Sequence, residues 1–154
     1  MIDLFRELQQ ITEAMDREGI EYALVGGLAY SVLVEVRATE DIDLLIKPED
    51  WERTPETLKN LGYEDLADPM DFKNIRIRRL VKLGDGDSVV LDFILADQED
   101  WLEGLKKATR LKQGNRSYVI APAETIISLK EKRMSGIDRS DIMGLKKLIE
   151  DRRP

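Results

Sequence analysis

A pair of strand-like runs near the middle of the chain limits its fold more than any other pattern. The strand-like runs 75–83 and 89–96 flank residues 84–87, which read Gly-Asp-Gly-Asp. A central Asp-Gly pair between two such runs is a strong signal for a β-hairpin. If the chain turns at the middle of that segment, the antiparallel register places Arg79 opposite Asp92. The pattern therefore predicts an antiparallel strand pair that brings opposite charges together.

Other periodic patterns predict helices interspersed with further strands. Apolar residues at helical spacing indicate an amphipathic helix over residues 2–18 that ends at Gly19. The apolar run 22–25 and the alternating run 41–47 indicate two more strands. Further expected elements are helices over 28–34, 48–61, 98–107, 122–134 and 138–150, and a last strand over 118–121.

The order of these elements favours one mixed fold. Strands and helices follow each other without strict alternation, which is typical of an α/β or α+β domain with a mixed β-sheet and helices mainly on one face. A length of 154 residues suits a single domain over residues 1–154, and 42% hydrophobic residues can supply one core.

Hydropathy and charge indicate a cytoplasmic protein. No apolar stretch approaches the length needed to cross a bilayer, and the N-terminus lacks the pattern of a signal peptide, so we expect no membrane partner. The net charge of -7 argues against non-specific coating of nucleic acid, because neutralisation of phosphates dominates that affinity. A local basic patch could still hold an RNA end.

The absence of cysteine and histidine excludes several kinds of chemistry. Thiolate nucleophiles, disulfides, zinc held by Cys or His, and a His general base are all impossible. Any reaction must use carboxylates, Lys, Arg, Tyr, hydroxyl groups or a metal held by oxygen. Oxygen-only sites favour Mg²⁺, Mn²⁺ or Ca²⁺.

Asp41 and Asp43 are the first candidates for such a site. On a strand, side chains two residues apart share a face, with Cα atoms roughly 6.5 Å apart. Two carboxylates placed in this way can converge on one or two cations, whereas without a metal they repel each other. An isolated Asp-x-Asp pattern is also typical of a solvated strand face, so the metal hypothesis depends on further features.

Gly26 and Gly27 are such a feature, since they follow the expected strand 22–25 and begin the next helix. Glycine lets a backbone come close to a ligand, and free N–H groups at the start of a helix attract phosphate. The alternative is a tight turn with no ligand.

Taken together, the two features resemble the signature of the DNA-polymerase-β-type nucleotidyltransferase superfamily. That signature is a strand ending in Gly-Gly or Gly-Ser, a helix, and an Asp-x-Asp strand, and it covers residues 22–46 of this chain. Many members carry Ser where Gly27 stands. The resemblance implies that the glycine turn binds a nucleoside triphosphate (NTP) and that Asp41 and Asp43 bind Mg²⁺.

Asp92 is the expected third acid, because the superfamily usually has one on a later strand. A lone acid in the apolar run 89–96 needs a partner. One hypothesis is a metal ion, with Arg79 steadying Asp92 or contacting the substrate. The alternative is a buried Arg79–Asp92 ion pair that fixes the register of the hairpin. The two readings are compatible, and we favour a metal role for Asp92.

Lys130 lies in an apolar stripe of the helix expected over 122–134. Such a lysine snorkels, pairs with an acid or points into a site. Residues 121–141 resemble the downstream helices of the abortive-infection toxin branch of the superfamily. In that branch the lysine serves the triphosphate, so Lys130 is a candidate phosphate contact.

These observations predict a metal-dependent nucleotidyltransferase that moves a nucleoside monophosphate from an NTP to a hydroxyl acceptor. The acceptor stays open among an RNA end, a protein and a small molecule. The expected catalytic and metal-binding residues are Asp41, Asp43 and Asp92 with Mg²⁺ or Mn²⁺, and the expected nucleotide-binding residues are Gly26, Gly27 and Lys130.

Two rival hypotheses belong to other classes. The chain could be a catalytically inactive NTP-binding or regulatory module, including one of a toxin–antitoxin type system, or a metal-binding scaffold without NTP affinity. The small size leaves little room for an acceptor domain, which a homodimer or a partner protein could supply.

Overall fold

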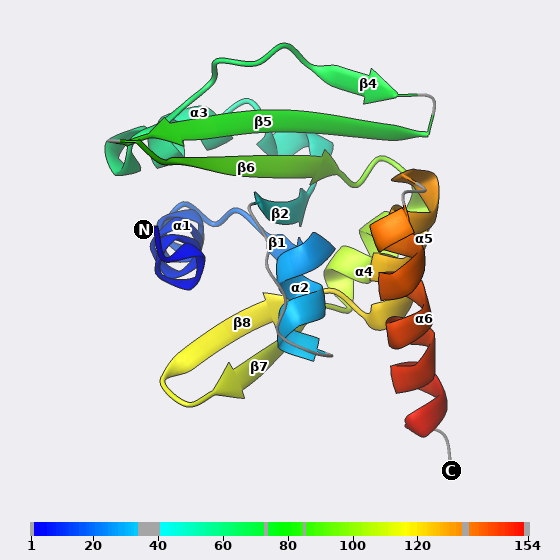
Figure 1. Ribbon diagram of the computed structural model, residues 1–154. Coiled ribbons are helices and arrows are strands. Elements are labelled where there is room, and N and C mark those ends of the chain that lie inside the picture. Colours follow the sequence, from blue (N-terminus) through cyan, green and yellow to red (C-terminus); the bar gives the residue numbers. More distant parts are fainter. Residues whose placement is uncertain (1, 34–40, 73, 85, 134–135, 153–154) are drawn as a thin grey trace.

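A computed structural model describes residues 2–33, 41–72, 74–84, 86–133 and 136–152. For residues 133–142 it describes no side chains. Within these residues, eight strands form one sheet in the order β3-β5-β6-β2-β1-β8-β7, and β4 pairs with β5 (Figure 1). The strands are β1 (Tyr22–Val25), β2 (Asp41–Ile46), β3 (Tyr63–Glu64), β4 (Met70–Phe72), β5 (Ile75–Leu83), β6 (Ser88–Leu95), β7 (Thr109–Gln113) and β8 (Arg116–Ile120).

The sheet is mixed, as the sequence predicts. β2 runs parallel to β6 and antiparallel to β1, while β1 runs parallel to β8. β5 and β6 form the expected antiparallel hairpin, and Arg79 is paired with Asp92 in its register. The prediction from the turn sequence is therefore confirmed.

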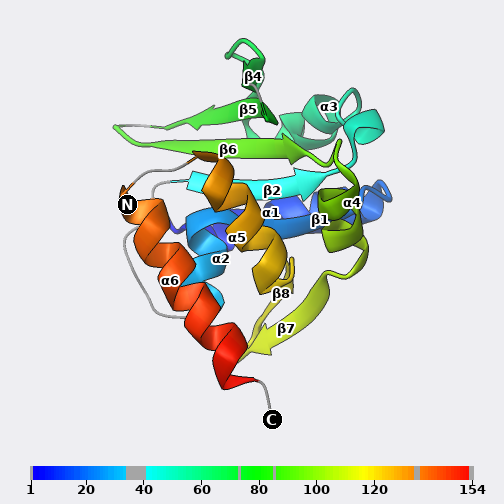
Figure 2. The ribbon, with the colours of Figure 1, turned by 90° about the vertical axis from the view of Figure 1, so that its right-hand side faces the viewer.

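Helices cover both sides of this sheet unequally. In the described residues, α2, α4, α5 and α6 lie on one side and α1 on the other, and Figures 1 and 2 agree on this arrangement. The expected mixed fold with helices mainly on one face is confirmed. The α-helices are α1 (Leu4–Arg17), α2 (Gly26–Leu33), α3 (Thr54–Leu58), α4 (Glu99–Lys106), α5 (Ala123–Arg133) and α6 (Gly136–Asp151).

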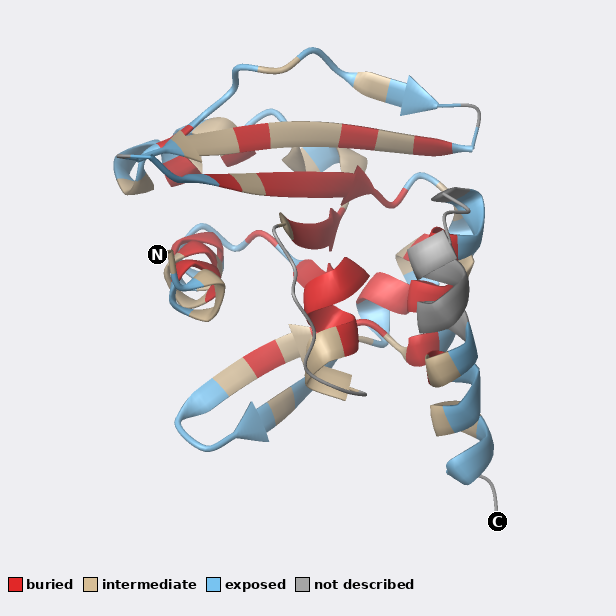
Figure 3. Cartoon of the chain, viewed as in Figure 1, coloured by how far each residue is buried: buried red, intermediate tan, exposed pale blue. Residues whose placement is uncertain are grey.

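The core lies between these two layers of helices. Figure 3 shows that buried residues are concentrated in β2, β6, β1 and the start of α2, whereas β4 and β7 are largely exposed. Every residue of β2 after Asp41 is buried. Polar side chains on these central strands are therefore surrounded by apolar ones.

One buried polar cluster attaches α1 to the sheet. Glu7 accepts a hydrogen bond from the Tyr63 hydroxyl at 2.9 Å and pairs with Lys82 at 2.8 Å. Burial, and then the hydrogen bond to Glu7, raise the pKa of Tyr63 far above its usual range. The cluster satisfies a carboxylate in the apolar stripe of α1 and so has a structural role.

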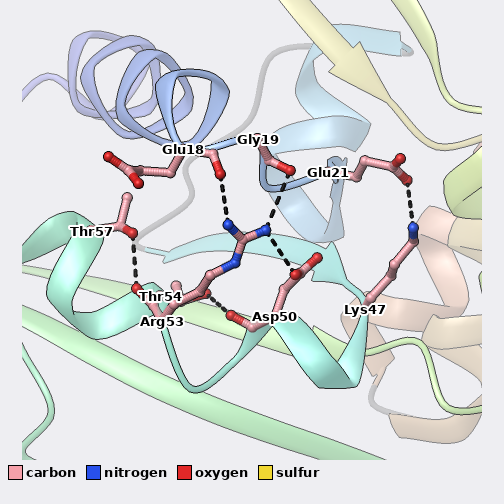
Figure 4. Close-up of polar contacts among 8 residues, drawn as sticks. All are labelled: Glu18, Gly19, Glu21, Lys47, Asp50, Arg53, Thr54 and Thr57. Carbon is pink, nitrogen blue, oxygen red and sulfur yellow. Dashed lines mark hydrogen bonds and ion pairs between the residues drawn. The ribbon is translucent and has the colours of Figure 1, made fainter.

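A second cluster closes the opposite end of α1 (Figure 4). Arg53 donates to the main-chain oxygens of Glu18 at 2.7 Å and Gly19 at 3.4 Å, and to the Asp50 carboxylate at 3.0 Å. These bonds satisfy carbonyl groups that the end of a helix leaves without partners. The Arg53 cluster therefore anchors the segment after β2 to the first helix.

Several sequence expectations need correction. The helix expected over 48–61 is broken into a 3₁₀ turn at Pro48–Asp50, α3, and a second 3₁₀ turn at Lys59–Leu61. Strands β3, β4 and β7 were not expected. They are short or exposed and lie at the margins of the sheet, so they lack the alternation of buried and exposed residues that reveals a strand.

None of the described helices is both long enough and apolar enough to cross a bilayer.

Candidate active site

One row of residues crosses four adjacent strands at the same level. Val25 of β1 is paired with Asp43 of β2, Asp43 with Asp92 of β6, and Asp92 with Arg79 of β5. Residues paired across neighbouring strands project from the same face of a sheet. The row therefore places two carboxylates and a guanidinium group side by side, and we call Asp43, Asp92 and Arg79 the charged row.

Asp41 lies on the same face of β2, one step from the charged row. It is two residues before Asp43 on the strand and is paired with Val90 of β6. Asp41 is half-buried, whereas the exposed fractions of Asp43 and Asp92 are only 6% and 4%. The three acids named from the sequence thus occupy adjacent positions on neighbouring strands, as the motif implies.

Gly26 packs directly against one of these acids. Its φ of 72° is favourable only for glycine, and a Cβ there would collide with the Asp43 carboxylate and lie 2.9 Å from the Asp43 Cβ. Gly26 also begins α2, so the free N–H groups at the start of that helix lie beside the row. The turn therefore combines a close approach of backbone with a site suited to phosphate.

Arg79 holds Asp92 with a two-pronged ion pair. Its Nε donates to Oδ1 of Asp92 at 2.8 Å and its Nη2 to Oδ2 at 3.0 Å. The pKa of Arg79 is raised, chiefly by this hydrogen bonding, against the opposing effect of burial, and further by the charges of Asp92, Asp41 and Asp43. Arg79 therefore interacts electrostatically with all three acids.

The acids fit a hard divalent cation by chemistry and by position. They offer only oxygen donors, which Mg²⁺ and Mn²⁺ prefer, from adjacent points on two central strands. Within the described ranges, no group of three acidic, His or Cys side chains is already arranged to hold a metal ion. Both oxygens of Asp92 accept hydrogen bonds from Arg79, so a metal ion at this acid would lie close to the positive charge of Arg79.

Lys130 is placed on α5, a helix that contacts α2, α4 and α6. Its side chain is buried, with 4% exposure, in a helix on the same side of the sheet as α2 (Figure 2). Its role as a phosphate contact stays a prediction. Residues 37–40 of the motif, and the side chains of residues 139–141, lie outside the described part of the chain.

The sequence relates Arg79 to Asp92 and the substrate. In the structure, Arg79 also interacts with Asp41 and Asp43. The turn between β5 and β6 gave its register with Asp92, but its proximity to Asp41 and Asp43 depends on β2 lying beside β6. Two strands that are far apart in the sequence carry no local signal of such pairing.

Comparison with known proteins gives the family of the chain and the likeness of its fold. Residues 2–119 match the protein family described as "Uncharacterised nucleotidyltransferase". Among curated proteins, no sequence matches the chain significantly.

Similar folds occur in solved structures over most of the chain. One is ANT(2'')-Ia in complex with adenylyl-2''-tobramycin, with 18% identity, a TM-score of 0.64, and coverage of 96% of this chain and 88% of that one. A nucleotidyltransferase-like protein from Thermotoga maritima has 17% identity and a TM-score of 0.63, with coverage of 99% and 97%. The lincosamide antibiotic adenylyltransferase LnuA, bound to lincomycin, has 16% identity and a TM-score of 0.59, with coverage of 93% and 96%. At such identities the likeness concerns the fold.

Proposed function

The chain belongs to this nucleotidyltransferase family, and on that premise we propose that it transfers a nucleoside monophosphate from an NTP to a hydroxyl acceptor with the help of Mg²⁺ or Mn²⁺. The observation that carries the proposal is the pairing of Asp43 with Asp92 on adjacent strands, beside a glycine that packs on Asp43. Buried carboxylates next to each other are costly unless a cation balances them.

Each residue has a defined task in the transfer. Asp41 and Asp43 hold the cation that accompanies the triphosphate. The N–H groups at Gly26 and Gly27, together with Lys130, hold phosphate oxygens. Asp92 lies next to Asp43, would complete the metal site and orients the acceptor hydroxyl. These roles are the ones that the sequence predicts.

The transfer exchanges one bond of the α-phosphorus for another. A bond forms between the acceptor oxygen and the α-phosphorus. The bond between the α-phosphorus and the oxygen that bridges to the β-phosphate breaks, and pyrophosphate leaves. Asp92 receives the proton of the acceptor hydroxyl. Bound Mg²⁺ supplies charge stabilisation for both the attacking and the leaving oxygen.

A small molecule is the acceptor class that we propose first. Two solved structures with a similar fold are described as an antibiotic adenylyltransferase and as a complex with an adenylylated aminoglycoside. The similarity spans 88% and 96% of those chains, which supports the view that a chain of this size accommodates such an acceptor. RNA ends and protein hydroxyls are the other acceptor classes.

Isotope labelling tests the transfer. Wild-type protein with Mg²⁺ should move label from α-³²P-NTP to an acceptor in panels of small molecules, RNA and proteins, and should move none from γ-³²P-NTP. Asp43→Asn should lower the rate by at least about a hundredfold, because even outer partners of a metal ligand affect activity by 10–100-fold. Asp65→Asn, at an exposed carboxylate, is the matched control and should keep full activity. Transfer of the γ-label, or full activity of Asp43→Asn, would contradict the proposal.

A second candidate is a catalytically inactive NTP-binding module, including one of a toxin–antitoxin system, as the downstream resemblance suggests. The bidentate ion pair of Arg79 with Asp92 favours it, because the positive charge of Arg79 opposes a metal ion at this acid. In that case Mg²⁺ with NTP at a hundred times Kd should stabilise the fold by about 2.7 kcal/mol without any labelled product. The absence of both stabilisation and turnover would leave a scaffold role.

A further inference from the structure

Arg79 satisfies the acid of the charged row that is most distant from the glycine turn. Both oxygens of Asp92 accept hydrogen bonds from Arg79, at 2.8 and 3.0 Å. A fork of this kind is among the strongest side-chain pairs, because both bonds are charge-assisted. Each oxygen of the carboxylate therefore has a charged donor without a metal ion.

The two members of this pair differ in exposure. The Asp92 side chain is 6% exposed and the Arg79 side chain 35% exposed. The carboxylate is fixed within the sheet, whereas the guanidinium group lies at the side facing solvent. Arg79 is therefore the member that can leave, with its charge then solvated.

The other acids of the site lie within the electrostatic reach of the same guanidinium group. Asp43 is the direct strand neighbour of Asp92, and the charges of Asp41 and Asp43 both stabilise charged Arg79. Three carboxylates on two adjacent strands repel each other when no cation is near. Arg79 offsets that repulsion from its position beside Asp92 in the charged row.

We propose that Arg79 is a built-in counter-ion of the acids, which holds Asp92 while the row lacks a metal and releases it when a divalent cation binds. This inference rests on the proposed metal-dependent function. A cation bound to Asp92 would lie close to the positive charge of Arg79, and the two charges repel each other. Arg79 therefore weakens cation binding and stabilises the metal-free protein, and it is a positioning residue.

Calorimetric titration with Mn²⁺ alone, without nucleotide, tests the competition. Arg79→Gln removes the competing charge, so the variant should bind Mn²⁺ roughly tenfold more tightly than wild type, within the usual range of coupling between sites. Arg78→Gln is the matched control, because Arg78 is the adjacent residue on β5 and pairs with Asp71 instead. This control should bind Mn²⁺ as wild type does.

A double-mutant cycle separates competition from a general structural role. In the Asp92→Asn background, Arg79→Gln should change the Mn²⁺ affinity much less, because the ligand that Arg79 holds directly is gone. A structural role would give the same change in both backgrounds. Arg79→Lys keeps the charge but lacks the fork, and it should give a smaller gain in affinity. If Arg79→Gln does not fold, Arg79→Lys is used in its place for the titration.

The outcomes distinguish this inference from the proposed function. Equal or weaker Mn²⁺ binding by the folded Arg79 variants overturns the counter-ion, while labelling experiments still decide the transfer. Tighter binding without any labelled acceptor supports the counter-ion and removes nucleotidyl transfer. If wild type and all variants bind no Mn²⁺ in the absence of nucleotide, the counter-ion is wrong, while the labelling experiments still decide the transfer.

Discussion

Arg78 and Arg79 are consecutive residues of β5, yet they take part in opposite kinds of ion pair. Arg78 extends to one face, where it pairs at 2.7 Å with Asp71 on the marginal strand β4. Arg79 extends to the other face and holds Asp92 in the central strand β6. The Asp71 side chain is 54% exposed and that of Asp92 is 6% exposed.

This difference in burial decides what each pair does. Water already solvates Asp71, so its pair with Arg78 contributes little to stability. The Asp92 carboxylate is largely removed from solvent, so its negative charge must be stabilised by a neighbouring cation. The two arginines show that similar contact distances have different consequences at the margin and in the centre of one sheet.

The largest effect on stability is expected at the glycine end of the charged row. Gly26→Ala should destabilise the protein by about 3 kcal/mol, because a left-handed φ adds about 1 kcal/mol to the cost of overlap with Asp43. Gly86 also has a positive φ, of 77°, but a Cβ there meets nothing within 4 Å. Gly86→Ala should therefore cost only about 1 kcal/mol. Urea denaturation measures both, and equal losses would show that Gly26 does not pack tightly on the row.

The next effect concerns the two arginines themselves. Arg79→Met should cost about 2–3 kcal/mol in metal-free buffer, because it leaves the buried carboxylate of Asp92 without a cation, although water reaches part of the site. Arg78→Met should cost far less, because it leaves behind a carboxylate that is solvated, the exposed Asp71. Denaturant unfolding of the two variants gives the comparison. Losses of similar size would contradict the role that we assign to burial.

The smallest effect is a shift in the titration of Asp71. The hydrogen bond from Arg78 lowers the pKa of Asp71 below its ordinary value of 3.8. The charged form is therefore favoured in the folded state, and the stabilisation is present above pH 3.8 and lost as the pH falls through the lowered value. Carboxyl NMR should detect this shift, and Arg78→Gln should return the pKa towards its ordinary value. An unchanged titration in that variant would show that the pair does not persist in solution.

Local sequence was sufficient for the elements around the site. The Asp-Gly turn placed Arg79 opposite Asp92, because a two-residue loop fixes the register of a hairpin. The run of residues 22–25 before two glycines, and the alternation from Asp41 onwards, gave β1, the start of α2 and β2. Each of these signals depends on neighbours within a few residues.

The sequence by itself limited the candidate side chains, since a chain without Cys or His leaves only oxygen ligands, Lys and Arg for chemistry of the proposed kind. Only the tertiary structure decided that β2 lies parallel to β6, which sets Asp43 beside Asp92 and brings Arg79 within reach of all three acids. The physical reason is that such pairing is chosen by burial of apolar strands against helices from the whole chain. No short segment contains the information about which distant strand it will contact.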